Sequence, residues 1–133
     1  MPVGTQWKAE DIFRKACALI SQTTEDSPEL ESFSPDWLDI WLVEALSFEN
    51  ARRRYEADPA RPVLATAPVV AKMDDVVPYD DEICRVALPY AMACQFYIDD
   101  ENEYRAQDFR ARFVNALADT QKLREGIVRD VYA

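Results

Sequence analysis

The residues that could carry chemistry in this chain of 133 residues are mainly carboxylates, which form three short clusters at residues 74–75, 80–82 and 99–103. Neighbouring carboxylates can share a proton in acid–base catalysis or hold a divalent cation. The first two clusters have no partner base or arginine at a spacing that would complete such a site. The run 99–103 lacks the loop glycine and the terminal glutamate of an EF-hand. We therefore expect these carboxylates to cap helices and to be solvated.

Other catalytic chemistry is not indicated. The chain has no histidine, which is the usual general base near neutral pH and a common metal ligand. Two glycines are too few for a phosphate-binding loop, and no G-x-S-x-G motif is present. Cys17, Cys84 and Cys94 are odd in number and contain no C-x-x-C pair, so buried, reduced thiols are predicted. The sequence thus predicts no catalytic residue, no metal and no cofactor.

Two further groups of residues could take part in binding. Arg52, Arg53 and Arg54 form the basic cluster of the sequence. They complement the negative end of a predicted helix, or they contact a phosphate or an acidic partner. Trp37 and Trp41 lie one helical turn apart, as core aromatics or as interface anchors. Both alternatives remain open for each group.

The overall charge restricts the partners. A formal net charge of −10 repels nucleic acid and anionic lipid, and it also keeps a small protein soluble. A more specific interpretation is that the acidic surface lets DNA pass without sticking, or imitates DNA. Residues 1–10 do not resemble a signal peptide, and the apolar stretch 86–98 is too short to span a membrane. We expect a soluble protein that is intracellular when made.

Hydrophobic periodicity predicts a mainly α, four-helix bundle-like single domain over residues 1–133. The first helix is expected at residues 7–21 with Thr5 as a cap, followed by a loop at residues 23–33. Ser34-Pro35-Asp36 has the sequence of a helix start, and Asp58-Pro59 that of a helix stop. The second helix is apolar around most of its circumference, so it is either central or shared with another subunit. Two more helices are expected within residues 81–122, joined by an acidic turn in which Asp99 or Asp100 caps the last helix.

Two segments are predicted to be extended. Residues 61–81 contain three prolines, and their valine pairs at 69–70 and 76–77 favour two short strands. Gly126 is expected to stop the fourth helix, which leaves residues 123–133 as an apolar tail that docks on this subunit or on another. Pro89 predicts that the third helix either begins near Arg85 or kinks.

The order of these packing patterns resembles the small head–tail connector proteins of tailed phages, also called head-completion or neck adaptor proteins. The similar features are the amphipathic helix at residues 7–13, the Trp/Leu-rich second helix and the Pro-rich stretch. Further similar features are the run 87–93 (Ala-Leu-Pro-Tyr-Ala-Met-Ala) and the acidic turn that follows it. The helical pattern Ala106, Phe109, Phe113, Ala116, Leu117 and the ending at residues 127–132 are also similar. The resemblance spans most of the chain, which departs from it by lacking a glycine in the loop after the first helix.

The resemblance implies a virion structural protein, not an enzyme, assembled in the cytoplasm of the bacterial host. Such proteins form a ring, commonly of twelve copies, beneath the portal and offer a platform to a tail or stopper protein. DNA passes through the channel without specific binding, and no membrane is involved. The residues expected to contact other subunits or the portal are Trp37, Trp41, Val69, Val70, Ile127, Val128, Val131 and Tyr132.

Two other classes remain open. One is a small acidic interaction module, such as a DNA mimic or an inhibitor of a host protein, which would be monomeric or dimeric. The other is an enzyme, which the missing histidine and the missing nucleophile motifs disfavour.

Overall fold

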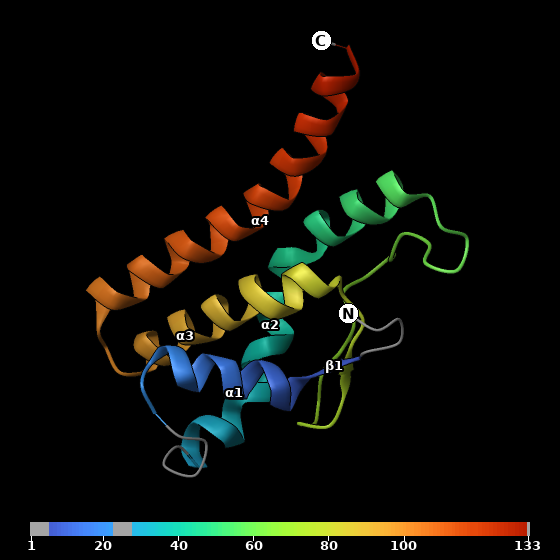
Figure 1. Cartoon of the computed structure of the whole chain (residues 1–133). Helices are drawn as coiled ribbons and strands as arrows, with labels where there is room; N and C mark the ends of the chain where they lie inside the picture. Colours follow the sequence, from blue (N-terminus) through green and yellow to red (C-terminus); the bar gives the residue numbers. More distant parts are fainter. Residues whose placement is uncertain (1–5, 23–27, 133) are drawn as a thin grey trace.

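The computed structural model describes the backbone of residues 6–22 and 28–132 and the side chains of these segments up to Thr120 (Figure 1). In this part of the chain helices predominate, which confirms the mainly α prediction. They are α1 (Ala9–Leu19), α2 (Pro28–Glu56), α3 (Leu88–Asp99) and α4 (Glu103–Tyr132), with a π-helical turn η1 (Ile83–Ala87) leading into α3. Two short strands, β1 (Trp7–Lys8) and β2 (Val76–Val77), pair antiparallel, with Trp7 opposite Val77.

Helix α3 is the centre of the fold and packs against the other three helices. Its sequence is apolar on almost every side, and its alanines allow the neighbouring helices to approach closely. The fully buried residues of α3 are Leu88, Ala91, Met92 and Ala93. Of the two alternatives predicted for the second helix, the central position is wrong: α2 covers one side of α3 and leaves part of its own apolar surface in solvent.

Helix α1 begins two residues later than predicted because Trp7 and Lys8 pair with β2. The Asp11 carboxylate accepts a hydrogen bond of 3.0 Å from the Lys8 N–H and so closes the first turn. The predicted cap, Thr5, lies outside the described residues.

The predicted start of the second helix at Ser34-Pro35-Asp36 is wrong, because α2 begins at Pro28 and Pro35 lies inside it. Pro28 takes a position where no N–H is needed, and Glu29 and Glu31 face the positive helix end. Pro35 costs one backbone hydrogen bond, but Ser34 and Pro35 are buried, so packing offsets that loss.

The predicted end of α2 is confirmed. The helix ends at Glu56, and Ala57 adopts a left-handed conformation with φ of 52° before Asp58-Pro59.

Residues 61–81 are extended, as predicted, and are fixed to α2 by side-chain hydrogen bonds. The Asn50 amide bonds both the N–H and the C=O of Leu64, at 2.8 and 2.9 Å. The Tyr79 hydroxyl donates to the Leu42 carbonyl at 2.5 Å. The strand predicted at residues 69–70 is wrong, because the Val70 N–H donates to the Asp39 carboxylate, 2.9 Å away, and not to a strand.

Proline and acidic residues shape the two ends of α3. The predicted disturbance at Pro89 takes the form of η1, in which the Leu88 N–H bonds the Ile83 carbonyl five residues earlier. After α3, Glu101 is left-handed with φ of 58°. Asn102, not Asp99 or Asp100, caps α4 through a bond of 3.2 Å from the Arg105 N–H, since the chain needs two further residues to reverse direction.

Helix α4 continues through Gly126 to Tyr132, so the predicted helix stop and extended tail are wrong. A glycine inside a helix costs only about 1 kcal/mol relative to alanine, and no proline follows to prevent its continuation. Figure 1 shows the last turns of α4 running past the other helices toward the C-terminus. In the described part of the chain, no helix combines the length and the apolar character that a bilayer crossing requires.

Candidate interaction surfaces

The cysteine thiols are not poised for chemistry. Cys17, Cys84 and Cys94 are free and buried, as predicted. Burial, with a smaller effect of Glu31, raises the pKa of Cys17 from 9.0 to about 11. Burial also raises the pKa of Cys84 and of Cys94. Because the thiolate is the form that attacks and that binds metals, burial and a raised pKa make these thiols less reactive than an exposed cysteine.

We expect the native thiols to react with a disulfide reagent at about pH 8 at least a hundredfold more slowly than those of the urea-unfolded chain. The shift of the pKa of Cys17 to about 11 alone lowers its thiolate fraction about a hundredfold. Because the unfolded thiol loses its proton from pH 9.0 and the folded one only near 11, the contribution of Cys17 to stability is complete below pH 9.0 and declines toward pH 11. Absorbance of the released thiol measures the rates, and rapid native labelling would contradict the expectation.

The acidic clusters serve local structure. The Asp75 carboxylate accepts the N–H groups of Ala71 and Lys72 at 2.8 and 3.0 Å, and these bonds lower the pKa of Asp75. The Asp80 carboxylate accepts the Glu82 N–H at 3.0 Å. Among the described residues, no group of three or more acidic or cysteine side chains is arranged to hold a metal ion.

A buried ion cluster, made of Glu49, Arg53, Arg61 and the backbone of residues 78–80, joins α2 to the extended segment. Glu49 is fully buried, and its Oε2 accepts the Arg53 Nε–H at 2.6 Å and an Arg61 N–H at 3.2 Å. Its Oε1 accepts the Asp80 N–H at 2.6 Å. Arg53 also donates to the carbonyls of Pro62 and Pro78, at 2.9 and 2.6 Å. The polar groups of this cluster bond one another, so we assign the cluster a structural role.

The three arginines proposed as a contact for phosphate or an acidic partner therefore have different environments and do not form one basic surface. Arg53 is buried in the ion cluster and is not available to a partner. Arg52 pairs with Asp80, Glu56 and Glu82, each at 3.1 Å. Partial burial opposes its charge, but these carboxylates raise the pKa of Arg52 overall. Arg54 is exposed in the last turn of α2, where it complements the negative helix end.

The two tryptophans have different environments. Trp41 is only 4% exposed, and its Nε1–H donates to the Gln95 amide oxygen at 3.2 Å. Its ring meets Phe113 edge-on, with 5.1 Å between ring centroids, so Trp41 belongs to the core of this subunit. Trp37 is half-buried, 5.6 Å from the ring of Phe33 and 5.9 Å from that of Phe96.

An apolar surface remains on the side of α2 that faces away from α3, and we call it the outer face of α2. It comprises Phe33, Ile40 and Val43, of which Ile40 and Val43 are 61% and 63% exposed, and Trp37 lies at its edge, where the ring also contacts Phe96 of α3. Residues 28–51, which include this face, contain six carboxylates and neither lysine nor arginine. Glu49 among them is buried, but Asp36 and Glu44 are exposed beside Ile40, so the face is both apolar and acidic.

The residues predicted as contacts in the extended segment and the C-terminus differ in position. Val69 is 79% exposed, whereas Val70 is buried, because successive side chains alternate along an extended backbone. Val70 therefore packs inside the subunit. The remaining predicted contacts lie in the last turns of α4, and their side chains are outside the described part of the structure; they are Ile127, Val128, Val131 and Tyr132.

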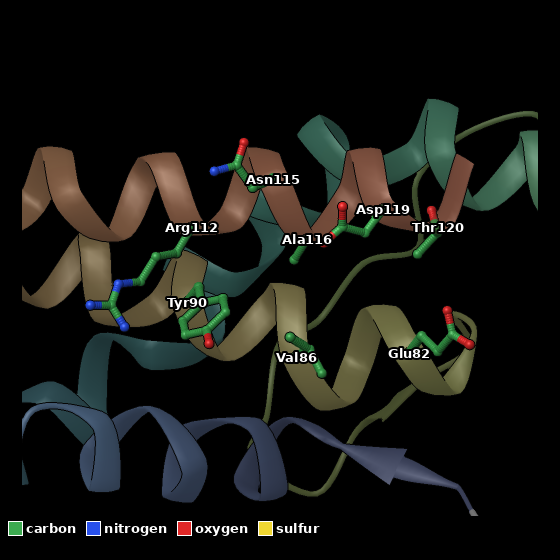
Figure 2. A pocket seen from close by; sticks show the side chains of 8 residues that line it. All are labelled: Glu82, Val86, Tyr90, Arg112, Asn115, Ala116, Asp119 and Thr120. Carbon is green, nitrogen blue, oxygen red and sulfur yellow. The ribbon is translucent and has the colours of Figure 1, made fainter. Parts of the chain in front are cut away.

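A surface groove, which the sequence analysis missed, crosses α3 between α1 and α4. Its α3–α4 half has a volume of about 420 Å³ and its α1–α3 half about 280 Å³, and the two halves share Val86 and Tyr90. Figure 2 shows Arg112 and Tyr90 at one end of the α3–α4 half and Glu82 and Asp119 toward the other. The α1–α3 half is lined by Lys15, Ala18, Leu19, Arg85, Val86, Pro89 and Tyr90.

The composition of this groove suits binding better than catalysis. It is open to solvent and lined by apolar side chains with charged residues among them, and its lining includes no cysteine or serine. In the α3–α4 half, Arg112 lies 5.2 Å from the Phe109 ring and pairs with Asp108 at 3.3 Å. Val86 is 41% exposed and lies one helical turn before Tyr90, and this spacing of two large side chains is the sequence signal that could have pointed to the surface.

Comparisons with protein-family models, with curated proteins and with solved structures found no match.

Proposed function

We propose that this chain is a virion structural subunit of a tailed-phage head–tail connector, assembling as a ring beneath the portal and linking the DNA-filled head to the tail. The resemblance of its packing patterns to such proteins motivates the proposal. The observation that carries it is α4, a helix of 30 residues whose C-terminal turns run past the rest of the molecule (Figure 1). Isolated helical turns are marginal in water, so we expect this end to pack against another chain.

The exposed apolar surface adds support. The outer face of α2 and Val69 place large apolar side chains in solvent. Exposed apolar patches of this kind mark protein–protein contacts, and a ring subunit must meet neighbours on more than one side.

The charge also suits a DNA channel. A subunit with a formal charge of −10 repels the phosphate backbone, so a ring of such subunits would let the genome slide without trapping it. On this proposal the partners are other copies of the chain, the portal protein and a tail or stopper protein.

The proposal is tested by the mass of the full chain in solution, alone and mixed with the portal protein encoded in the same genome. We expect a closed ring, or a ring-sized complex on the portal, by light scattering and negative-stain microscopy. A chain that stays monomeric in both conditions would overturn the proposal.

Removing residues 126–133 tests the end of α4 directly. We expect the truncated chain to lose ring or portal association. Its helical signal in far-UV circular dichroism should decrease only by the contribution of the deleted residues. The control is Gly126→Ala, which favours the helix by about 1 kcal/mol and should keep assembly intact. Assembly that is unchanged after truncation would refute a role for this end.

The acidic stretch of α2 favours a second candidate, a small acidic interaction module. Four exposed carboxylates and no basic residue over residues 28–51 would suit the surface of a basic protein; they are Glu29, Glu31, Asp36 and Glu44. Such a module would stay monomeric or dimeric and would bind its target with a steep salt dependence, whereas a connector forms a high-order assembly.

A further inference from the structure

We infer that the outer face of α2 of one copy docks in the α1–α3 half of the groove on a second copy. The inference rests on the proposed connector function, because it supplies the contact between neighbouring subunits of the ring. A ring requires contact between two unlike surfaces of the same chain, repeated head to tail.

The outer face of α2 supplies an apolar ridge with carboxylates beside it. Ile40 and Val43 are its most exposed apolar residues, at 61% and 63%. Asp36 and Glu44 are exposed four residues before and after Ile40, so they lie on the same side of the helix. Glu44 pairs with Arg110 at 3.7 Å, but both side chains are about half exposed, so this ion pair is weak and can be exchanged.

The α1–α3 half of the groove supplies the complementary chemistry. Its surface is apolar, and its charged lining residues are Lys15 and Arg85, with no carboxylate among them. The Lys15 ammonium lies 5.7 Å from the centre of the Trp7 ring, and no ion pair to it occurs within the described residues. Arg85 pairs with Asp81 at 3.3 Å in an exposed position, where such a pair contributes little.

The positions of the two surfaces favour a head-to-tail contact. Figures 1 and 2 show α1, α3 and α4 on the near side, with α2 passing behind α3. The inner side of α2 is held against α3 by the Trp41–Gln95 bond, so its outer face points away from the groove. Surfaces on opposite sides cannot close a two-fold dimer between themselves, and they generate a ring or a filament.

The charges also select against the wrong contact. Two outer faces of α2 brought together would place carboxylates against carboxylates, and two grooves would place cations against cations. Only the unlike pair joins opposite charges and buries apolar surface on both sides.

Reciprocal charge reversal tests this contact. One variant carries Lys15→Glu and Arg85→Glu in the groove, and the other carries Asp36→Lys and Glu44→Lys on α2. We expect each variant alone to associate at least tenfold more weakly than the natural chain, because each opposes like charges. An equimolar mixture of the two variants restores opposite charges at every contact, so we expect it to recover assembly; sedimentation equilibrium measures the affinities.

Matched controls separate a local contact from an effect of net charge. Asp99→Lys with Asp100→Lys changes the charge as much as the α2 variant does, in the exposed turn before α4. Arg54→Glu with Lys72→Glu matches the groove variant at two other exposed positions. We expect both controls to assemble within about twofold of the natural chain, as surface charges away from a contact have little effect.

The outcomes distinguish this inference from the proposed function. The measurements are made wherever the natural chain assembles, alone or on the portal. If it forms a ring that the charge reversals do not weaken, or if the mixture of variants does not recover, the docking surface is wrong and the connector proposal stands. If the natural chain forms no high-order assembly in either condition, both are overturned.

Discussion

Replacing Glu49 by glutamine should lower the free energy of unfolding by about 3–5 kcal/mol, the usual cost of breaking a buried ion pair by removing one partner. Both Glu49 oxygens accept hydrogen bonds, from Arg53 and Arg61 on one side and from the Asp80 N–H on the other. A glutamine must turn its NH₂ group toward one of these donors. The Arg53 guanidinium, itself 7% exposed, would then lie buried without its counter-charge.

Urea unfolding followed by circular dichroism measures this loss. The control is Glu56→Gln, which removes one of the three carboxylates paired with Arg52, a partly exposed one, and should cost less than about 1 kcal/mol. A Glu49→Gln variant as stable as this control would show that the ion cluster does not hold the extended segment to α2.

Replacing Phe113 by alanine should destabilise the fold by a similar amount, about 3–5 kcal/mol. Phe113 is 1% exposed and places its ring 5.1 Å from that of Trp41, where α4 meets α2. Truncation removes the buried ring and leaves a cavity that the helices on either side can fill only in part. The Trp41 indole loses its aromatic neighbour at the same time.

Thermal and urea unfolding measure the effect, and the fluorescence of the native state should change because the surroundings of Trp41 change. Val114→Ala is the matched control, one position further along α4 and 48% exposed, and it should cost about 0.5 kcal/mol or less. Equal losses for the two variants would contradict the assignment of Phe113 to the core.

Periodic patterns predicted the helices and much of the core correctly. Phe109, Phe113 and Leu117 recur at helical spacing, and the structure buries all three. The cysteines, each set among small apolar residues, are buried as expected. These predictions succeeded because hydrophobic periodicity is a local property. A continuous apolar stripe is buried in the folded protein regardless of which element packs against it.

Predictions that depended on distant partners were less accurate. Pro35 is accepted inside α2 because it is buried against the core, which no local rule anticipates. Arg53 is internal because Glu49 lies one turn away and the Pro62 and Pro78 carbonyls are brought to it by the extended segment. Gly126 does not end α4, since its helix cost is small and no residue nearby enforces a stop.

The sequence by itself determined that this protein is mainly helical and acidic, with an extended proline-rich segment and without the histidine that catalysis commonly uses. Only the tertiary structure decided that α3 is central, that α2 keeps an apolar, acidic face in solvent, and that α1, α3 and α4 border a groove with Lys15 and Arg85. The physical reason is that a helix face is exposed or covered according to which other helices pack on it, and that arrangement depends on contacts between residues far apart in the chain.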